Sequence, residues 1–343
     1  MARVLAYVVS GTVAASAVTP VDTSTNVAGA PIAIGGGAQS ILVTPNSRRV
    51  YVPSGILNTV TPIDTRTNAA RPPIPVGDEP FALVVTPNGR RVYVGNTSSN
   101  SVTLIRVSTN APLDTIPVGN GPNRVVITPN GRTVYTVNTS DNTVTPIRVS
   151  TNTAGPAISV GGFPNSAAIT PDGRTLYVGN LNDATVTPID VATNTPGTPI
   201  PVGHQPAVIV VTPNGKMAYV SNTDDDTVTP IRTANNAALP PIPVGHQPFD
   251  MAFTPNGRRL YVLTPGSNSV TPIHVVTNTA GAPISVPPLA FTLAVTPNGR
   301  TLYVTASPNV LVPIRVSTNH PGTPIIVGDQ PSAFAFAVLD DDD

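Results

Sequence analysis

The sequence of 343 residues contains no cysteine and no tryptophan, and only 10% of its residues are charged. The lack of cysteine excludes disulfides, thiolate metal sites and a cysteine nucleophile. The formal net charge is zero, which is not typical of proteins that bind nucleic acids, so we predict no nucleic-acid partner. No apolar run reaches the roughly 18 residues that a transmembrane helix needs. We therefore predict no membrane span.

Proline is abundant instead, with 41 residues, and it recurs at fixed places in an internal repeat. A turn of the form Thr-Pro-Asn-Gly, or a close variant, returns every 42 residues, beginning at Thr44, Thr86, Thr128, Thr170, Thr212, Thr254 and Thr296. The eight tyrosines of the chain all occupy one position of this repeat, at Tyr7, Tyr51, Tyr93, Tyr135, Tyr177, Tyr219, Tyr261 and Tyr303. A period of this length is typical of β-propellers and solenoids.

One repeat, at 80–119, predicts four short strands, which we name A to D. Strand A is the apolar segment 81–85, and a Pro-Asn-Gly turn joins it to the alternating strand B at 91–94. A polar loop leads to strand C at 101–107, and strand D follows at 114–118. Pro117 in strand D fits an outer edge, where a missing N–H costs little. Four strands per repeat without helical periodicity predict an all-β propeller of four-stranded antiparallel blades, with a solenoid as the alternative.

The two ends of the chain predict a closed ring. The first residues supply strands B, C and D by Gly35, whereas the segment from Ser332 to Leu339 supplies only a strand A. Joining them would complete one composite blade and remove the open sheet edges. We therefore predict a single eight-bladed β-propeller over residues 1–339, closed by the C-terminal strand, and a solvated acidic tail at 340–343.

The N-terminal segment, MARVLAYVVSGTVAASA, has the basic start, apolar stretch and small residues of a signal peptide. The same segment aligns with the repeat, because residues 6–8 match residues 92–94. Cleavage after Ala17 would remove a strand from the ring. We therefore predict a cytoplasmic protein, with a secreted or cell-surface protein as the alternative.

The segments that follow the turns indicate a family. Tyr-Val-Gly-Asn at 93–96 and 177–180 and Tyr-Val-Ser-Asn at 219–222, each before a Val-Thr-Pro-Ile strand or its variant, resemble the YVTN repeat. Other copies depart from it, since Tyr51 precedes Val-Pro-Ser and Tyr261 precedes Val-Leu-Thr. This family is similar to surface-layer propellers and, more distantly, to propeller lactonases and lyases, many with seven blades. The resemblance implies a fold but little chemistry, and no lactonase or lyase catalytic motif is present.

The charges separate by sign when they are placed on the predicted loops. The D-to-A and B-to-C loops share one face, called the upper face here, and the A-to-B and C-to-D turns share the lower face. Acidic residues gather on the upper face, at Asp78, Glu79, Asp141, Asp183, Asp224, Asp225, Asp226, Asp250 and Asp329. Arg124 is the one basic residue there. The ring of basic residues beside the lower turns fits a solubility device, with anion binding as the alternative.

Two histidines occupy the same place, Gly-His-Gln-Pro, in successive D-to-A loops. Adjacent blades would bring them to the mouth of the central channel, with Asp250 and three consecutive aspartates nearby. Imidazoles and carboxylates suit a divalent metal site or an acid/base pair. We therefore predict catalytic roles for His204, His246 and Asp250. One divalent metal ion is the one cofactor we consider, with the ligands His204, His246, Asp224, Asp225 and Asp226. The alternative is a duplicated, solvent-exposed turn, and no spaced motif such as His-Glu-x-x-His is present.

A set of substrate-binding residues is predicted around the same mouth. Three phenylalanines share the first strand-A position and would form the apolar wall of a pocket. The lone cation of this face would bind a ligand carboxylate or join a buried ion pair, and two glutamines would add hydrogen bonds. These residues are Phe81, Phe249, Phe291, Arg124, Gln205 and Gln247. His274 on strand C and His320 in a C-to-D turn are expected to be exposed, without a role.

Two functions remain open. The first is a non-redox enzyme, cofactor-free or metal-assisted, that acts on a small molecule at the upper face as a lactonase, lyase or cyclase. The second is a non-catalytic scaffold that holds a protein partner there, which the regular repeats without large loop insertions favour. The concentration of polar and aromatic departures from the repeat around one mouth favours the small-molecule site.

Overall fold

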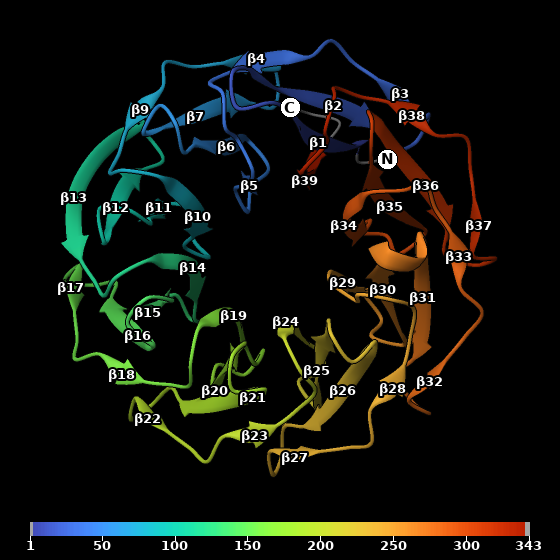
Figure 1. Cartoon of the computed structure of the whole chain (residues 1–343). Coiled ribbons are helices and arrows are strands. Elements are labelled where there is room, and N and C mark those ends of the chain that lie inside the picture. The colour runs from blue at the N-terminus through green and yellow to red at the C-terminus, as the bar shows by residue number, and fades with distance from the viewer. Residues whose placement is uncertain (1–2, 340–343) are drawn as a thin grey trace.

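A computed structural model describes residues 3–339 of the chain. Eight antiparallel sheets surround a central axis as the blades of a propeller (Figure 1). In seven blades the strands follow the chain order, and in the composite blade the last strand of the chain takes the place of strand A. Strand A lies nearest the axis and strand D outermost. Strand D forms in two short pieces in every blade except blade 3, where it is continuous. The predicted fold class and the blade number are confirmed.

The first four blades contain the following strands. Blade 1 comprises β39 (Ala333–Leu339), β1 (Arg3–Gly11), β2 (Ser16–Asp22), β3 (Val27–Ala28) and β4 (Ile32–Ile34). Blade 2 comprises β5 (Leu42–Val43), β6 (Arg49–Ser54), β7 (Thr59–Asp64), β8 (Ala69–Ala70) and β9 (Ile74–Pro75). Blade 3 comprises β10 (Pro80–Val85), β11 (Arg91–Asn96), β12 (Ser101–Arg106) and β13 (Ala111–Pro117). Blade 4 comprises β14 (Pro122–Ile127), β15 (Thr133–Asn138), β16 (Thr143–Arg148), β17 (Thr153–Ala154) and β18 (Ile158–Ser159).

The other four blades repeat this arrangement. Blade 5 comprises β19 (Pro164–Ile169), β20 (Thr175–Asn180), β21 (Thr185–Asp190), β22 (Thr195–Pro196) and β23 (Ile200–Pro201). Blade 6 comprises β24 (Pro206–Val211), β25 (Met217–Asn222), β26 (Thr227–Arg232), β27 (Ala237–Ala238) and β28 (Ile242–Pro243). Blade 7 comprises β29 (Met251–Phe253), β30 (Arg259–Thr264), the 3₁₀ turn η1 (Pro265–Ser267), β31 (Ser269–His274), β32 (Thr279–Ala280) and β33 (Ile284–Ser285). Blade 8 comprises β34 (Ala290–Val295), β35 (Thr301–Ala306), β36 (Val310–Arg315), β37 (His320–Pro321) and β38 (Ile325–Ile326).

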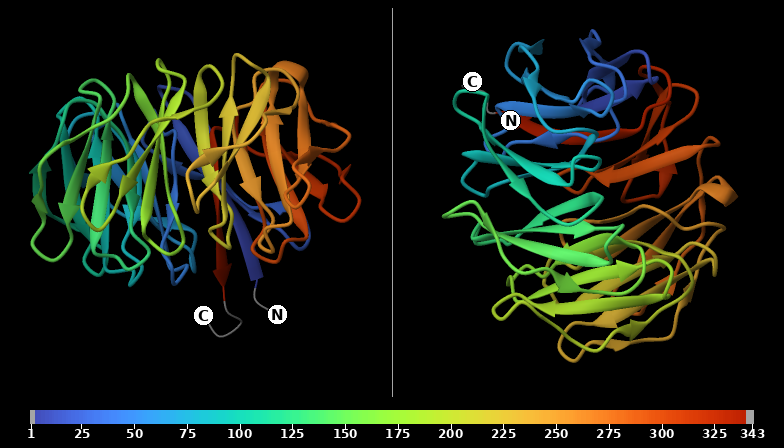
Figure 2. Two further views of the ribbon diagram at one scale, coloured as in Figure 1. Left: turned by 90° about the horizontal axis from the view of Figure 1, so that it is seen from below. Right: turned by 60° about the vertical axis from the view of Figure 1, so that its left-hand side comes forward.

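The C-terminal strand closes the ring as predicted. β39 pairs antiparallel with β1, in a register that runs from Arg3 opposite Leu339 to Val9 opposite Ala333. The first residue of β1 and the last residue of β39 lie side by side at the lower face, which points down in the left view of Figure 2. The composite blade thus has the same four strand positions as the others. The predicted acidic tail at 340–343 lies outside the described residues.

The turn between strands A and B explains why Thr-Pro-Asn-Gly recurs. The Thr86 hydroxyl donates to Oδ1 of Asn88 at 2.7 Å and accepts the N–H of Arg91 at 3.1 Å, so it closes the turn from both sides. Gly89 adopts a φ of 67°, which glycine reaches without the steric cost that a Cβ brings. Each copy therefore ends strand A at the same place and starts strand B in the same register.

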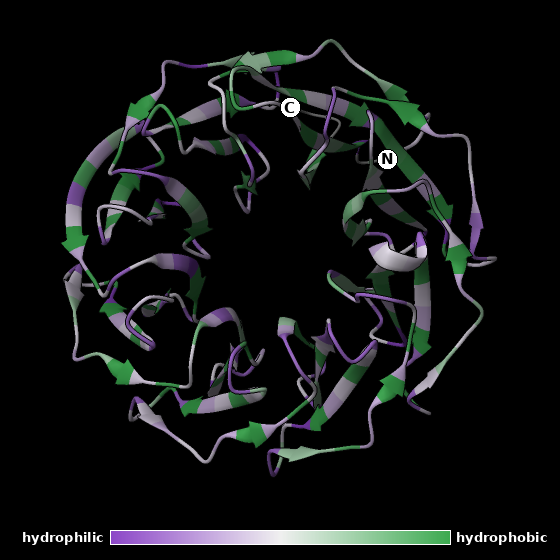
Figure 3. Cartoon of the chain, in the orientation of Figure 1, coloured by the Kyte–Doolittle hydropathy of each residue, from purple (hydrophilic) through white to green (hydrophobic). Residues whose placement is uncertain are grey.

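The apolar core lies between neighbouring blades. Tyr51, Val60 and Ile74 of blade 2, for example, pack against Val92 and Val94 of blade 3. All eight tyrosine rings are fully buried. In Figure 3 hydrophobic segments follow the strands of each blade, and polar residues gather in the loops. The ring is therefore held together by eight similar interfaces.

No helix among residues 3–339 is long and apolar enough to cross a membrane, in agreement with the expectation from the sequence.

Candidate functional site

The two loop histidines lie on the upper rim, each beside a different aspartate. Nδ1 of His204 is 2.9 Å from Oδ1 of Asp225. Nδ1 of His246 is 2.7 Å from Oδ2 of Asp226. The two imidazoles are exposed, by 76% and 73% of their side-chain area. The hydrogen bond that the imidazole donates to Asp225 and the charge of that carboxylate raise the pKa of His204. Blade 6 therefore presents two separate His–Asp pairs.

The same aspartates hold the loops in place. The backbone N–H of His204 donates to Oδ2 of Asp225 at 2.7 Å, and that of Gln247 donates to Oδ1 of Asp226 at 2.9 Å. Equivalent contacts occur in other blades, where Asp141 accepts from the N–H of Asn120 and Asp183 accepts from that of Gly162. Much of the acidic upper rim thus consists of carboxylates that bind the D-to-A loop to the next B-to-C loop.

The predicted metal ligands do not converge. No group of three or more His, Asp or Glu side chains that could hold a metal ion occurs within residues 3–339. Gln205 and Gln247 sit at φ values of 50° and 55°, which places them in tight turns. The metal site remains a prediction, and the geometry offers one imidazole and one carboxylate at each of two positions.

A second group of predicted residues lies lower, on the strands that surround the axis. Arg124 in β14 and Asp250, which directly precedes β29, occupy the same position of the repeat, 126 residues apart, which is three repeats. The residues at this position form a ring: Ser40, Ala82, Arg124, Ser166, Val208, Asp250, Thr292 and Ala333. Strand A carries a β-bulge at this level in blades 3, 4, 5, 6 and 8. Bulges redirect side chains and are frequent near functional sites.

The Arg124 guanidinium lacks an acceptor within the described part of the chain. It lies over the ring of Phe81, 5.6 Å from the centroid, but it forms neither a hydrogen bond nor an ion pair with residues 3–339. Burial lowers the pKa of Arg124, and the charge of Asp250 partly offsets this effect. The buried ion pair that the sequence left open is therefore not formed, and the five N–H donors of this side chain remain available.

Asp250, in contrast, accepts three hydrogen bonds within the chain. Oδ1 accepts the N–H of Met251 at 2.8 Å, and Oδ2 accepts the Thr292 hydroxyl at 2.6 Å and the N–H of Leu293 at 2.9 Å. Burial raises the pKa of Asp250, while these hydrogen bonds and the charge of Arg124 act in the opposite direction. The carboxyl group thus links blade 7 to blade 8.

Three aromatic rings complete what we call the axial cluster, which consists of Phe81, Arg124, Phe249, Asp250 and Phe291. The rings of Phe249 and Phe291 are 6.2 Å apart between centroids, and 51% of Phe291 is exposed. Sequence reasoning missed the polar neighbours at the same level, Asn123 and Asn165, whose buried Oδ1 atoms lack a hydrogen-bond partner. Aligning the first strand-A residues across repeats would have found them, because they share the position of Phe81.

The comparisons with known proteins agree on the class of fold. A family model described as a lactonase, 7-bladed beta-propeller, matches residues 24–157, which is less than half of this chain. The chain therefore resembles that family over part of its length and differs from the printed description in having eight blades. No curated protein matches the sequence. The YVTN resemblance stays a prediction.

Solved structures resemble the whole ring. The dihydro-heme d1 dehydrogenase NirN superposes with a TM-score of 0.83 at 17% identity, over 96% of this chain and 74% of that one. AztD from Citrobacter koseri gives a TM-score of 0.76 at 12% identity, over 99% of both chains. Hydrazine synthase from Kuenenia stuttgartiensis gives 0.65 at 21% identity, over 86% of this chain and 96% of that one. At these identities the likeness shows a β-propeller fold alone.

Proposed function

We propose that the chain binds a small organic acid at its axial cluster, with Arg124 as the anchor for the ligand's carboxylate. The observation that carries this proposal is the guanidinium of Arg124, which is desolvated without an acceptor. A charge taken out of water without a partner is costly. A carboxylate would accept two parallel N–H···O bonds from it.

The other members of the axial cluster narrow the class of ligand further. Phe249 and Phe291 offer an apolar wall for a ring or an alkyl chain, as small-molecule sites commonly do. The charge of Asp250 acts on Arg124, although the two side chains form no ion pair. A ligand that lies between them could therefore place its carboxylate at Arg124 and donate a hydrogen bond to Asp250. A hydroxy acid with an apolar group satisfies all three features.

A matched pair of probes tests this proposal. Mandelate carries a carboxylate, a hydroxyl and an aromatic ring, and mandelamide differs from it by the loss of the charge. We expect calorimetry to detect mandelate and related aryl hydroxy acids but not their amides. Arg124→Gln should lose this binding, whereas Arg106→Gln, on the exposed lower face, should keep it. If no acid of such a panel binds, the scaffold function, with a protein partner at the upper face, takes precedence.

A second function, lactone hydrolysis, is supported by the family match over residues 24–157. Opening a lactone yields a hydroxy acid, the class of ligand argued above. Asp250, whose pKa is raised by burial, would take a proton from a water molecule that attacks the carbonyl carbon. Arg124 would stabilise the oxyanion, the ring C–O bond would break, and the proton would pass to the leaving alkoxide.

Turnover of a lactone panel distinguishes this enzyme from a binding protein. We expect Asp250→Asn to abolish hydrolysis and to weaken the binding of the hydroxy acid less than Arg124→Gln does, because Arg124 anchors the carboxylate. Loss of activity in the His204→Ala/His246→Ala double variant instead would place the chemistry at the upper rim, as the sequence predicted. Binding without turnover in the wild type would leave the first function alone.

A further inference from the structure

The lower face carries a recess beneath blade 8, on the side opposite the axial cluster. Three hollows of about 850, 570 and 380 Å³ meet around the turn that follows β36. The first two share Thr318, His320 and Pro321, and the first and third share Val316 and Ser317. The volumes are in the range that small-molecule ligands occupy in proteins.

The charged residues that line this recess are all basic. Four arginines and two of the four histidines of the chain contribute to it: Arg258, Arg259, Arg300, Arg315, His274 and His320. Within residues 3–339, no aspartate or glutamate lines any of the three hollows. His274 and His320, which the sequence analysis left without a role, therefore lie at one place.

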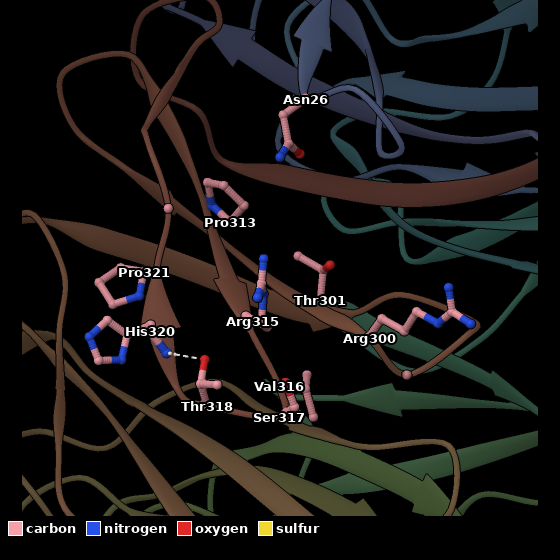
Figure 4. A pocket seen from close by; sticks show the side chains of 12 residues that line it. Asn26, Arg300, Thr301, Pro313, Arg315, Val316, Ser317, Thr318, His320 and Pro321 are labelled. Carbon is pink, nitrogen blue, oxygen red and sulfur yellow. Dashed lines mark hydrogen bonds between the residues drawn. The ribbon is translucent and has the colours of Figure 1, made fainter.

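Most of these cations have no partner of their own. Arg259 binds the carbonyl oxygen of Val316 at 2.6 Å and so holds the turn. The guanidinium groups of Arg258, Arg300 and Arg315, however, form no hydrogen bond or ion pair with any residue of the described part of the chain. In Figure 4 Arg315 lies between His320 and Arg300, with Thr301 beside it.

Neutral donors complete the lining. Hydroxyl groups come from Thr301, Ser317 and Thr318. Asn26 of blade 1 reaches across the hollow (Figure 4). Its Oδ1 accepts the Tyr303 hydroxyl at 2.5 Å, so its amide N–H₂ group is left as a donor. Guanidinium, imidazole and hydroxyl donors around one hollow match the oxygen-rich surface of a phosphate group.

We propose that this recess binds the phosphate group of a phosphorylated small molecule. The repeat shows how blade 8 differs from the blades that carry a carboxylate at the position of Arg315. Blades 3, 4 and 6 also have an arginine there, whereas blades 1, 2 and 5 carry Asp22, Asp64 and Asp190. Asp64 is paired with Arg49 at 2.6 Å and with Arg71 at 2.8 Å. The hollow between blades 4 and 5, of about 1020 Å³, includes Asp190 among its arginines. The recess beneath blade 8 has no such carboxylate among its described lining residues, so its arginines have no acidic side chain to neutralise their charge.

A charge-matched pair of variants tests the proposal. Arg232 occupies the position of Arg315 in blade 6 and is likewise exposed, so Arg315→Gln and Arg232→Gln remove the same charge at two places. Calorimetry in phosphate-free buffer with inorganic pyrophosphate as the probe should give saturable binding to the wild type. We expect Arg315→Gln to weaken it at least tenfold, and Arg232→Gln and Arg124→Gln to leave it within about twofold. Circular dichroism confirms that each variant is folded.

Several results would overturn the proposal. One is a lack of saturable pyrophosphate binding at millimolar concentration. Another is equal weakening by Arg315→Gln and Arg232→Gln, which would indicate a diffuse field of the lower face. Equal affinity for citrate would assign the recess to carboxylates. Binding to phosphatidylglycerol vesicles without binding to pyrophosphate would assign it to a membrane surface. None of these results depends on the axial cluster, so the two sites are tested separately.

Discussion

The Tyr303 hydroxyl donates a hydrogen bond to Oδ1 of Asn26 at 2.5 Å, across the junction where blade 8 meets blade 1. The same bond joins every pair of neighbouring blades, as in Tyr7 to Asn68 at 2.7 Å and Tyr177 to Asn236 at 2.6 Å. Each accepting asparagine has a positive φ, near 55°, which asparagine tolerates better than most residues. In each blade one asparagine thus shapes the C-to-D turn and accepts the hydrogen bond of the tyrosine from the preceding blade.

Tyr303→Phe tests the contribution of this bond to stability. The ring would stay buried while the hydroxyl is lost, so we expect the free energy of unfolding to fall by about 1 kcal/mol. Tyr177→Phe should cost a similar amount, because its bond is equivalent. Urea unfolding followed by circular dichroism measures both. A much larger loss for Tyr303 would show that the junction between the chain ends limits the stability of the whole ring.

The closure of the ring can be tested by an engineered disulfide. Val4 and Val338 lie opposite each other on β1 and β39, and directly opposed residues in antiparallel strands have Cα separations that a disulfide can bridge. Because the chain has no other cysteine, Val4→Cys/Val338→Cys should form one intramolecular disulfide on oxidation and raise Tm. Val4→Cys/Val276→Cys, with its second cysteine on blade 7, should remain reduced. A disulfide-linked dimer of the first variant would contradict closure within one chain.

The fold could be predicted because its determinants are local and repeated. The Thr-Pro-Asn-Gly turn, the tyrosine of strand B and the asparagine of the C-to-D turn recur with one period, and the strands follow from them. The two ends of the chain indicated a closed ring, because the N-terminal segment lacks a strand A and the C-terminal segment supplies one. The partner of each tyrosine was not predicted, since the two residues lie in different repeats, 59 positions apart in the case of Tyr177 and Asn236, and only packing of the blades brings them together.

The candidate site was harder to predict because sequence position fixes the loop but not the direction of a side chain. His204 and His246 do flank Asp225 and Asp226, as expected, yet each imidazole turns to a separate carboxylate. These carboxylates are committed to backbone N–H groups of the loops, a role that sequence spacing does not reveal. The shared position of Arg124 and Asp250 was visible in the repeat, but the missing partner of Arg124 is a property of the folded ring.

The His204–Asp225 pair predicts an elevated imidazole pKa. The hydrogen bond that the His204 imidazole donates to Asp225, together with the charge of this carboxylate, favours the protonated ring. We expect NMR titration to show His204 losing its proton above the ordinary histidine range. Asp225→Asn should return the pKa toward that range. Asp226→Asn, which removes the carboxylate beside His246 instead, should leave His204 unchanged. A titration of His204 that is insensitive to Asp225→Asn would contradict the observed pairing.

The metal hypothesis has a direct test in the same loops. Structural zinc sites commonly have four protein ligands and catalytic sites three, whereas each pair here supplies two. We therefore expect a chelator to leave Tm unchanged and elemental analysis of tag-free protein to find less than one metal ion per chain. A stoichiometric metal that disappears in His204→Ala/His246→Ala would restore the predicted site and require the loops of blade 6 to move together.

The buried carboxyl group of Asp250 predicts a particular dependence of stability on pH. Burial raises its pKa in the folded protein above the ordinary value of 3.8, so the folded state holds this proton more tightly than the unfolded chain does. The stabilisation is fully present below the unfolded pKa and is lost as the pH rises through the folded pKa.

Asp250→Asn removes this titration, so the stability of the wild type relative to the variant should decrease as the pH rises from about 4 toward neutrality. Urea unfolding of both proteins at several pH values measures the difference. Asp225→Asn provides a control of opposite sign, because the N–H and imidazole of His204 lower the pKa of Asp225. The contribution of Asp225 should appear above its ordinary pKa and vanish as the pH falls through the folded value. If the wild type and Asp250→Asn differ by a constant amount at every pH, the pKa of Asp250 is the same in the folded and unfolded states, and the general-base role proposed for it in lactone hydrolysis would lose the support of a raised pKa.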